Sequence, residues 1–171
     1  SAPLETLETN ILGTAKVLEA IRVLGQDPVI HVCASSEVFG RVPKEFLPIH
    51  EDITFHPASP YAISKVGTDL VGRFYGEAYG MTVMTTRMFT HTAVSAYYLL
   101  VTKDPQAGEY YNIGGSYTCT IREMLDYLIS ISTTKDIKIE VDPDRLRPID
   151  ADLQIPDVSK FKKHTGWEPK I

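Results

Sequence analysis

Tyr61 and Lys65 are the residues whose types and spacing most strongly suggest chemistry. They lie four positions apart in a stretch with helical periodicity, so their side chains share one face of the predicted helix. A lysine ammonium beside a phenol favours the phenolate, which makes the tyrosine a general base. The same spacing also occurs by chance, so an unreactive surface pair is the alternative interpretation.

Ser35 and Glu37 strengthen the first interpretation. They follow the apolar, β-branched run 28–34, which predicts a strand covered on both sides. Open α/β sheets bind ligands at the carboxyl ends of their strands, and Tyr61 begins the next helix along the chain. We therefore expect these side chains to border one site. The alternative is a serine that closes a turn and a solvated carboxylate.

Helical and strand patterns alternate along the chain. Apolar periodicity predicts helices over 3–25, 61–79, 96–100, 121–131 and 158–164, and short apolar runs predict strands over 28–34, 81–89, 109–113 and 137–141. The proline-rich stretch 40–60 predicts a long irregular loop around a site. Together these patterns predict an α/β fold built on a parallel sheet.

Composition limits the classes of protein to consider. The 171 residues are 43% hydrophobic and 23% charged, which excludes a mainly disordered chain. A net charge of -5 without a long basic run argues against a partner nucleic acid or an anionic membrane. No apolar run is long enough to span a membrane and no leader is evident, so we expect a soluble, cytoplasmic protein.

The cysteines and histidines give no sign of a metal centre. We expect Cys33 and Cys119 to be buried as small hydrophobic residues rather than joined in a disulfide. The histidines lack the spacing of metal ligands, so no metal is expected; those considered are His31, His50, His56 and His164.

Five short motifs, in this order, resemble the extended short-chain dehydrogenase/reductase family. They are residues 10–14 (NILGT), 34–40 (ASSEVFG), 59–65 (SPYAISK), 87–91 (RMFTH) and 111–115 (YNIGG). The resemblance extends from about Leu7 to Pro169. It implies a Rossmann-like, doubly wound parallel sheet with a small C-terminal α/β substrate-binding part.

Within that family the chain is most similar to the GDP-mannose 4,6-dehydratase group. Glu37 stands two residues after Ser35, as in the dehydratases, and residues 146–153 (LRPIDADL) match an Arg-Pro-x-Glu-x-Asp-Leu segment of the GDP-mannose enzymes. The resemblance implies an enzyme, a lyase, that converts a GDP-hexose to its 4-keto-6-deoxy form by internal hydride transfer. The cofactor it implies is NADP, with NAD as the alternative.

The resemblance implies four catalytic residues. Tyr61 would remove the proton from O4 of the sugar, and Lys65 would keep Tyr61 ionised and reach the cofactor ribose, so both also bind the cofactor. Ser35 would donate a hydrogen bond to O4. Glu37 would take the proton from C5 and help the C6 hydroxyl to leave.

Further binding residues are implied by the same motifs. His91 would contact the cofactor, Arg147 the diphosphate and Asp150 the nucleotide ribose, although a surface pair of Arg147 and Asp150 is the alternative. Ser35 and Thr90 would contact the sugar. Thr90 stands where the family usually has asparagine, which leaves the substrate open between GDP-mannose and GDP-manno-heptose.

The family comparison also predicts the domain organisation. Residues 1–92 would form part of the cofactor-binding and catalytic domain. Residues 93–171 would form mainly the nucleotide-sugar-binding domain, with some return to the core. The family's glycine-rich cofactor turn would precede Ser1, and roughly fifty to sixty residues of substrate lid would lie between Thr92 and Ala93. We therefore expect a break in the family pattern close to Thr92.

The helices at 7–24 and 61–79 carry apolar residues beyond one stripe, including Phe74, Tyr75 and Tyr79. A helix that is apolar on more than one side needs a second partner. In the family these two helices pair with those of a neighbouring subunit, so we expect a homodimer or a tetramer.

Two other functions are compatible with the motifs. A GDP-4-keto-6-deoxyhexose reductase or a nucleotide-sugar epimerase would share the fold and much of the site. A non-catalytic nucleotide-binding protein is the alternative from a different class, and the intact set of Ser35, Glu37, Tyr61 and Lys65 argues against it.

Overall fold

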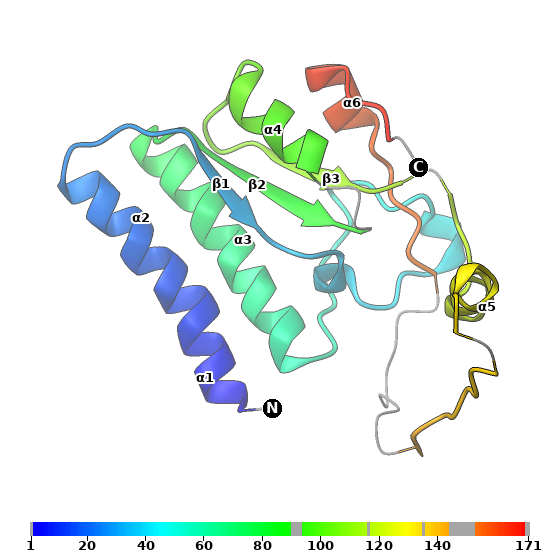
Figure 1. Ribbon diagram of the computed structural model, residues 1–171. Coiled ribbons are helices and arrows are strands. Elements are labelled where there is room, and N and C mark those ends of the chain that lie inside the picture. Colours follow the sequence, from blue (N-terminus) through cyan, green and yellow to red (C-terminus); the bar gives the residue numbers. More distant parts are fainter. Residues whose placement is uncertain (1, 90–93, 116, 135, 144–152, 170–171) are drawn as a thin grey trace.

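A parallel three-stranded sheet lies at the centre of the computed structural model (Figure 1), which describes all residues except 1, 90–93, 116, 135, 144–152 and 170–171. Its strands are β1 (Ile30–Cys33), β2 (Val83–Met88) and β3 (Tyr110–Ile113), in the order β1-β2-β3. The parallel register pairs Ile30 with Val83 and Thr85 with Tyr110. The predicted α/β fold with a parallel sheet is confirmed.

Helices cover both faces of this sheet. On one face, α1 (Pro3–Leu7), the π turn η1 (Glu8–Leu12) and α2 (Gly13–Val23) continue one another and lie beside α3 (Pro60–Tyr79), as Figure 1 shows. On the other face lie α4 (Val94–Thr102) and α6 (Ser159–Thr165), while α5 (Ile121–Ile131) stands apart from the sheet. These bounds confirm the five predicted helices.

The alternation of side chains along β2 builds a core on each face. Val83 is buried with Leu18 beneath α2 and α3, whereas the next residue, Met84, is buried with Leu100 and Phe161 beneath α4 and α6. Successive residues of a strand point to opposite faces, so β2 contributes to the cores beneath both helical layers.

Helix α3 begins and ends where its sequence dictates. The Ser59 hydroxyl accepts a hydrogen bond from Ala62 N at 3.0 Å, and Pro60 fits the first turn, where no N–H partner is needed. Gly80 ends the helix with φ +65°, a conformation that glycine adopts easily. The side of α3 facing the sheet carries small or short side chains, so the helix approaches the sheet closely.

The predicted strand over 137–141 is wrong. These residues have no regular secondary structure, and Ile137, Ile139 and Val141 are 42%, 38% and 74% exposed. Alternating apolar residues form a strand only when a neighbouring strand takes up the backbone hydrogen bonds. Within the described ranges, no strand pairs with this segment.

The expected burial of the two cysteines is also wrong. Cys33 is exposed and Cys119 is partly exposed. Cys33 ends β1, which is an edge strand of the described sheet, so this strand is less covered than its apolar sequence predicts.

One further property follows from the helices. Over the residues the structure describes, no helix has both the length and the apolar character needed to cross a membrane.

Two glycines give a paired test of the close approach between α3 and the sheet. A methyl group at Gly76 would lie 2.3 Å from the backbone nitrogen of Gly108, whereas one at Gly13 would meet nothing within 4 Å. Gly13→Ala should stabilise the protein by up to about 1 kcal/mol through helix propensity. Gly76→Ala should destabilise it by about 1–3 kcal/mol, because backbone atoms must move. Urea denaturation measures both; equal effects of the two substitutions would contradict the close packing.

Candidate active site

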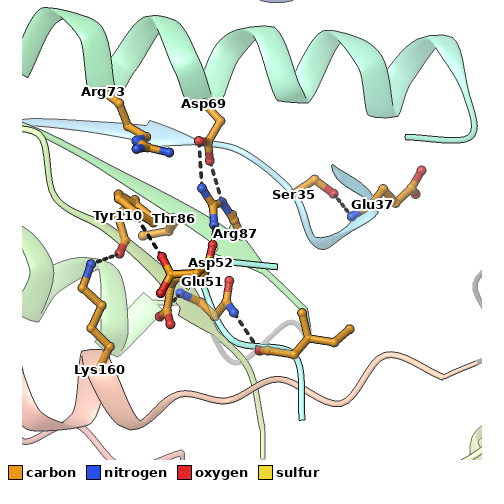
Figure 2. Close-up of polar contacts among 12 residues, drawn as sticks. Ser35, Glu37, Glu51, Asp52, Asp69, Arg73, Thr86, Arg87, Tyr110 and Lys160 are labelled. Carbon is orange, nitrogen blue, oxygen red and sulfur yellow. Dashed lines mark hydrogen bonds and ion pairs between the residues drawn. The ribbon is translucent and has the colours of Figure 1, made fainter. Parts of the chain in front are cut away.

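Ser35 and Glu37 lie directly after β1, at its carboxyl end, where the sequence placed them. Ser35 precedes the short 3-10 helix η2 (Ser36–Phe39), and its hydroxyl oxygen accepts a hydrogen bond from Glu37 N at 3.2 Å (Figure 2). A hydroxyl group that accepts one bond can still donate its proton. Ser35 is therefore held in place with a donor to offer to a ligand.

Tyr61 and Lys65 occupy the first two turns of α3. The Lys65 ammonium lies 5.7 Å from the centroid of the Tyr61 ring, so the structure brings the predicted pair together. The same ammonium donates a hydrogen bond of 2.8 Å to the carbonyl of Cys33. This bond ties α3 to the end of β1, and it leaves two of the three ammonium N–H groups for other partners.

All four predicted catalytic residues stand on elements that touch one another. Helix α3 packs against both β1 and η2, so Tyr61 and Lys65 border the edge of the sheet that Ser35 and Glu37 follow. The Tyr61 side chain is 42% exposed and is accessible to a solute. Their catalytic roles remain predictions, but the expected grouping of elements is present.

An open hollow of about 370 Å³ lies between β1 and the first helices, and Lys65 and Cys33 line it. Asn10 lines it as well, from the π turn. Its side-chain amide donates to Ser64 Oγ at 2.9 Å, and its carbonyl accepts from Thr68 Oγ1 at 3.0 Å. From the sequence, Asn10 was evident only as part of the motif at residues 10–14, because helical periodicity does not reveal a π turn. Such turns are frequent at functional sites.

The residues around this hollow suit the nicotinamide-ribose end of a dinucleotide. The Lys65 ammonium can donate to ribose hydroxyls, and Thr14 and Thr68 line the same hollow. The 171 residues contain no G-x-G-x-x-G turn, the element that holds the pyrophosphate in dinucleotide-binding folds. The described site therefore matches one end of such a cofactor.

A buried ion pair joins β2 to α3 (Figure 2). Arg87 donates from Nε and Nη2 to the two carboxylate oxygens of Asp69, at 2.8 and 3.0 Å, and from Nη1 to the carbonyl of Glu51, at 2.7 Å. Both side chains of the pair are fully buried. Sequence reasoning missed the pair because its members are 18 positions apart, and Arg87 entered only as part of a motif.

Burial also shifts two pKa values near the site. Desolvation raises the pKa of Glu51, although its carboxylate accepts a hydrogen bond of 2.9 Å from Asn112 N. Desolvation lowers the pKa of His31 from 6.5 to about 4, so its ring is neutral at neutral pH. That ring shares a hydrogen bond of 2.7 Å with the Thr86 hydroxyl.

Four other predicted site residues lie outside the described residues: Thr90, His91, Arg147 and Asp150. Their proposed contacts with cofactor and substrate stay predictions. Among the residues that the structure does describe, no group of three or more His, Cys, Asp or Glu side chains could hold a metal ion.

Comparison with known proteins adds evidence of kinship. The family model described as GDP-mannose 4,6 dehydratase matches residues 1–107. The chain is similar to the GDP-6-deoxy-D-mannose reductase of Pseudomonas aeruginosa, with 25% identity over 99% of the chain and 70% of the reductase. It is also similar to GDP-mannose 4,6 dehydratase 1 of Arabidopsis thaliana, with 26% identity over 97% of the chain and 58% of that protein.

The fold is shared with a solved structure. RMD from Pseudomonas aeruginosa, complexed with NADPH, superposes with a TM-score of 0.85 at 25% identity, covering 99% of this chain and 70% of that one. The sequence alignment with the reductase runs over 213 positions, more than the 171 residues of the chain. The reductase therefore contains residues that have no counterpart here.

The buried, neutral His31 predicts a loss of stability in acid. Between pH 6.5 and pH 4 the unfolded chain binds a proton that the folded chain does not, so the free energy of unfolding falls as the pH falls through this window. His31→Gln keeps a hydrogen-bonding side chain and should remove about 2 kcal/mol of this dependence between pH 7 and pH 4.5.

Chemical denaturation at the two pH values measures the effect. Gln106→Ala, at an exposed position in the segment between α4 and β3, is the control and should leave the pH dependence unchanged. Identical pH dependence of the wild type and His31→Gln would show that His31 is not the group responsible.

Proposed function

Because the chain belongs to the GDP-mannose 4,6-dehydratase family, we propose that it carries the catalytic centre of a nucleotide-sugar 4,6-dehydratase acting on a GDP-hexose. The observation that carries this proposal is the Lys65 and Tyr61 pair beside the end of β1, where Ser35 and Glu37 follow. An ammonium, a phenol, a hydroxyl and a carboxylate are the groups that the reaction needs. The names of the two curated relatives place both among enzymes of GDP-mannose derivatives.

The nicotinamide cofactor, NADP or NAD, supplies an acceptor for the hydride from C4 of the sugar and a donor that returns it to C6. NADP is the first choice, because the structural neighbour was solved with NADPH. In this proposal Tyr61 takes the proton from the O4 hydroxyl as a general base. The Lys65 ammonium favours the phenolate and binds the cofactor ribose. The Ser35 hydroxyl donates a hydrogen bond to O4 and orients the sugar.

Glu37 carries the elimination in this proposal. A ketone at C4 makes the proton on C5 acidic, so a carboxylate can remove it. The protonated Glu37 then gives a proton to the departing C6 hydroxyl, which leaves as water and produces a C5–C6 double bond. The 4-keto-6-deoxy sugar would be completed by return of the hydride to C6 and addition of a proton from solvent to C5, while Tyr61 would release the O4 proton to solvent, so that the protons balance. The backbone N–H of Glu37 is already held by Ser35, which couples the positions of the two residues.

The remaining predicted residues would complete the substrate site. Arg147 pairs with the diphosphate, Asp150 binds the nucleotide ribose, Thr90 contacts the hexose and His91 contacts the cofactor. We further propose that residues 1–92 belong to the cofactor-binding and catalytic domain, and residues 93–171 mainly to the nucleotide-sugar-binding domain. The second of these returns to the core through β3, the third strand of the sheet.

A reductase of GDP-4-keto-6-deoxyhexoses is the second candidate. The Pseudomonas aeruginosa reductase matches nearly the whole chain, at an identity close to that of the Arabidopsis thaliana dehydratase. Hydride transfer at C4 needs Tyr61, Lys65 and Ser35 in either reaction. A reductase of this fold can carry Ser-Ser-Glu as well, but only the dehydratase requires a base at C5. The requirement for the Glu37 carboxylate therefore separates the two functions.

The purified full-length protein should be incubated separately with GDP-mannose and GDP-manno-heptose, with NADP or NAD in catalytic amounts. The dehydratase would lower the substrate mass by about 18 Da, the mass of one water, without consuming a reductant. Stoichiometric oxidation of NADPH on a GDP-4-keto-6-deoxyhexose, with no water lost from either substrate, would favour the reductase instead.

Substitutions at the centre separate the proposed roles. Tyr61→Phe should lower kcat by about 10²–10⁴-fold, because the general base is removed. Glu37→Gln should abolish water loss while leaving hydride transfer measurable by the reduction of the cofactor. Tyr98→Phe, which removes the same hydroxyl from an exposed position on α4, is the matched control and should retain full activity. Full dehydratase activity in Glu37→Gln would remove this residue from the mechanism.

We also propose that α1, α2 and α3 form a homodimer interface. Apolar side chains on these helices, and on the π turn η1 between α1 and α2, are strongly exposed although the helices already pack on the sheet. They are Leu4, Leu12, Val17, Val23, Ile63, Leu70, Phe74 and Tyr79. Exposed apolar side chains concentrated on adjacent helices are typical of an interaction surface. A second copy of the same helices would cover this face, and two such dimers would give a tetramer.

Light scattering after gel filtration tests the interface. The wild type should show the mass of a dimer or tetramer, and Leu70→Glu combined with Phe74→Glu should give a smaller species, because two charges would be buried without partners. Ile131→Glu, at a similarly exposed apolar position on α5, should leave the mass unchanged. A monomeric wild type would refute the interface.

A further inference from the structure

We propose that Arg87 is a positioning residue for the catalytic centre: its guanidinium fixes Tyr61 and Lys65 relative to Ser35 and Glu37. This inference rests on the proposed function, because it assigns Arg87 a role in the geometry of that centre. Arg87 itself is fully buried in the sheet and touches none of the reacting groups.

The first line of evidence is the bond to α3. Asp69 lies four residues after Lys65, one helical turn further along the same helix. Arg87 donates two parallel hydrogen bonds, of 2.8 and 3.0 Å, to the carboxylate of Asp69. A two-point contact fixes the rotation and the axial position of α3 on β2, and Lys65 and Tyr61 move with this helix.

The second line of evidence is the loop that leads into α3. The Nη1 group of Arg87 donates to the carbonyl of Glu51, in the stretch between η2 and α3. The ring centroid of Phe55, in the same stretch, lies 4.7 Å from the guanidinium carbon of Arg87. Figure 2 shows the guanidinium between Asp69 on one side and Glu51 on the other.

The third contact reaches the segment that carries the other two site residues. Phe39 belongs to η2, the short helix that follows Ser35 and contains Glu37, and its ring centroid lies 5.4 Å from the guanidinium carbon. Phe39 is fully buried, so η2 cannot move without disturbing this contact. One side chain thus touches α3, its preceding loop and η2.

The choice of an arginine supports a positioning role. Taking both charges out of water is costly, and well-packed apolar residues in place of a buried ion pair often give equal or greater stability. A lysine in the same place would offer a point charge rather than a planar fork. The planar guanidinium fixes the direction of its hydrogen bonds, and so the orientation of the groups it contacts. Catalysis depends on such orientation, because a displacement of about 1 Å can lower the rate about 100-fold.

The test replaces the pair by apolar residues. Arg87→Met combined with Asp69→Val removes both buried charges together, and Arg87→Lys keeps the charge but loses the fork. The matched control is Arg122→Met with Asp126→Val, which removes an exposed ion pair from α5. Each full-length variant is measured for its denaturation midpoint, for kcat and KM, and for amide hydrogen exchange at residues 35–40 and 60–66.

Positioning predicts a specific pattern. The double variant at Arg87 and Asp69 should keep a denaturation midpoint near that of the wild type and a similar KM, while kcat falls by about 100-fold. Amides in 35–40 and 60–66 should exchange faster than in the wild type, with protection elsewhere unchanged. Arg87→Lys should show the same local loss of protection, and the control should match the wild type.

A stable double variant with unchanged kcat and unchanged local exchange would overturn the proposal. If that variant does not fold, Arg87→Lys decides: wild-type kcat and protection in it would overturn the role of the fork. If the wild type itself converts none of the GDP-sugars, the proposed function fails, and local hydrogen exchange still determines whether Arg87 holds the two segments in place.

Discussion

The ion pair between Arg87 and Asp69 is the contact on which the arrangement of the site depends. A guanidinium wholly removed from water loses several kcal/mol of hydration, and only a complete set of partners offsets this loss. Asp69 and the carbonyl of Glu51 supply hydrogen bonds, and the rings of Phe55 and Tyr110 lie 4.7 Å from the guanidinium carbon. Because these partners come from α3, from β3 and from the loop before α3, those segments and β2 must be in place together. The geometry of the site is thus coupled to the formation of the core.

The close approach of α3 to the sheet transmits this constraint to the surface. Glycines on its buried side, Gly72 and Gly76, allow the helix to lie close to its neighbours. A methyl group at Gly72 would meet the side chains of Thr85 and Val32, and one at Gly76 would meet the backbone of Gly108, just before β3. The Lys65 ammonium can then reach the Cys33 carbonyl at 2.8 Å. A bulkier helix face would hold Lys65 farther from β1 and widen the space between the phenol and Ser35. Packing of small residues therefore helps to set the position of this ammonium group.

The site divides into a shared part and a distinguishing part. An ammonium, a phenol and a hydroxyl at a strand end serve hydride transfer at a sugar carbon in general, which is why kinship with both a reductase and a dehydratase is compatible with Tyr61, Lys65 and Ser35. The carboxylate of Glu37 is needed only where a carbon–hydrogen bond is broken next to a ketone. In the proposed mechanism the two reactions therefore differ in their requirement for Glu37. This residue lies in η2, its backbone N–H is held by Ser35, and η2 packs against the buried core through Phe39.

Interactions between residues close together in the sequence determined much of the local structure. The start of α3 at Ser59 and Pro60, its end at Gly80, and the shared face of Tyr61 and Lys65 depend on residues a few positions apart, and all are present. The strand ends that place Ser35 and Glu37 were equally evident from the apolar run before them. Tertiary structure decided what depends on distant neighbours: whether 137–141 finds a partner strand, whether Cys33 is covered, and whether Arg87 meets Asp69. A sequence pattern shows which surface a segment must bury. Only the folded chain shows which other segment covers it, because that depends on contacts between residues far apart in sequence.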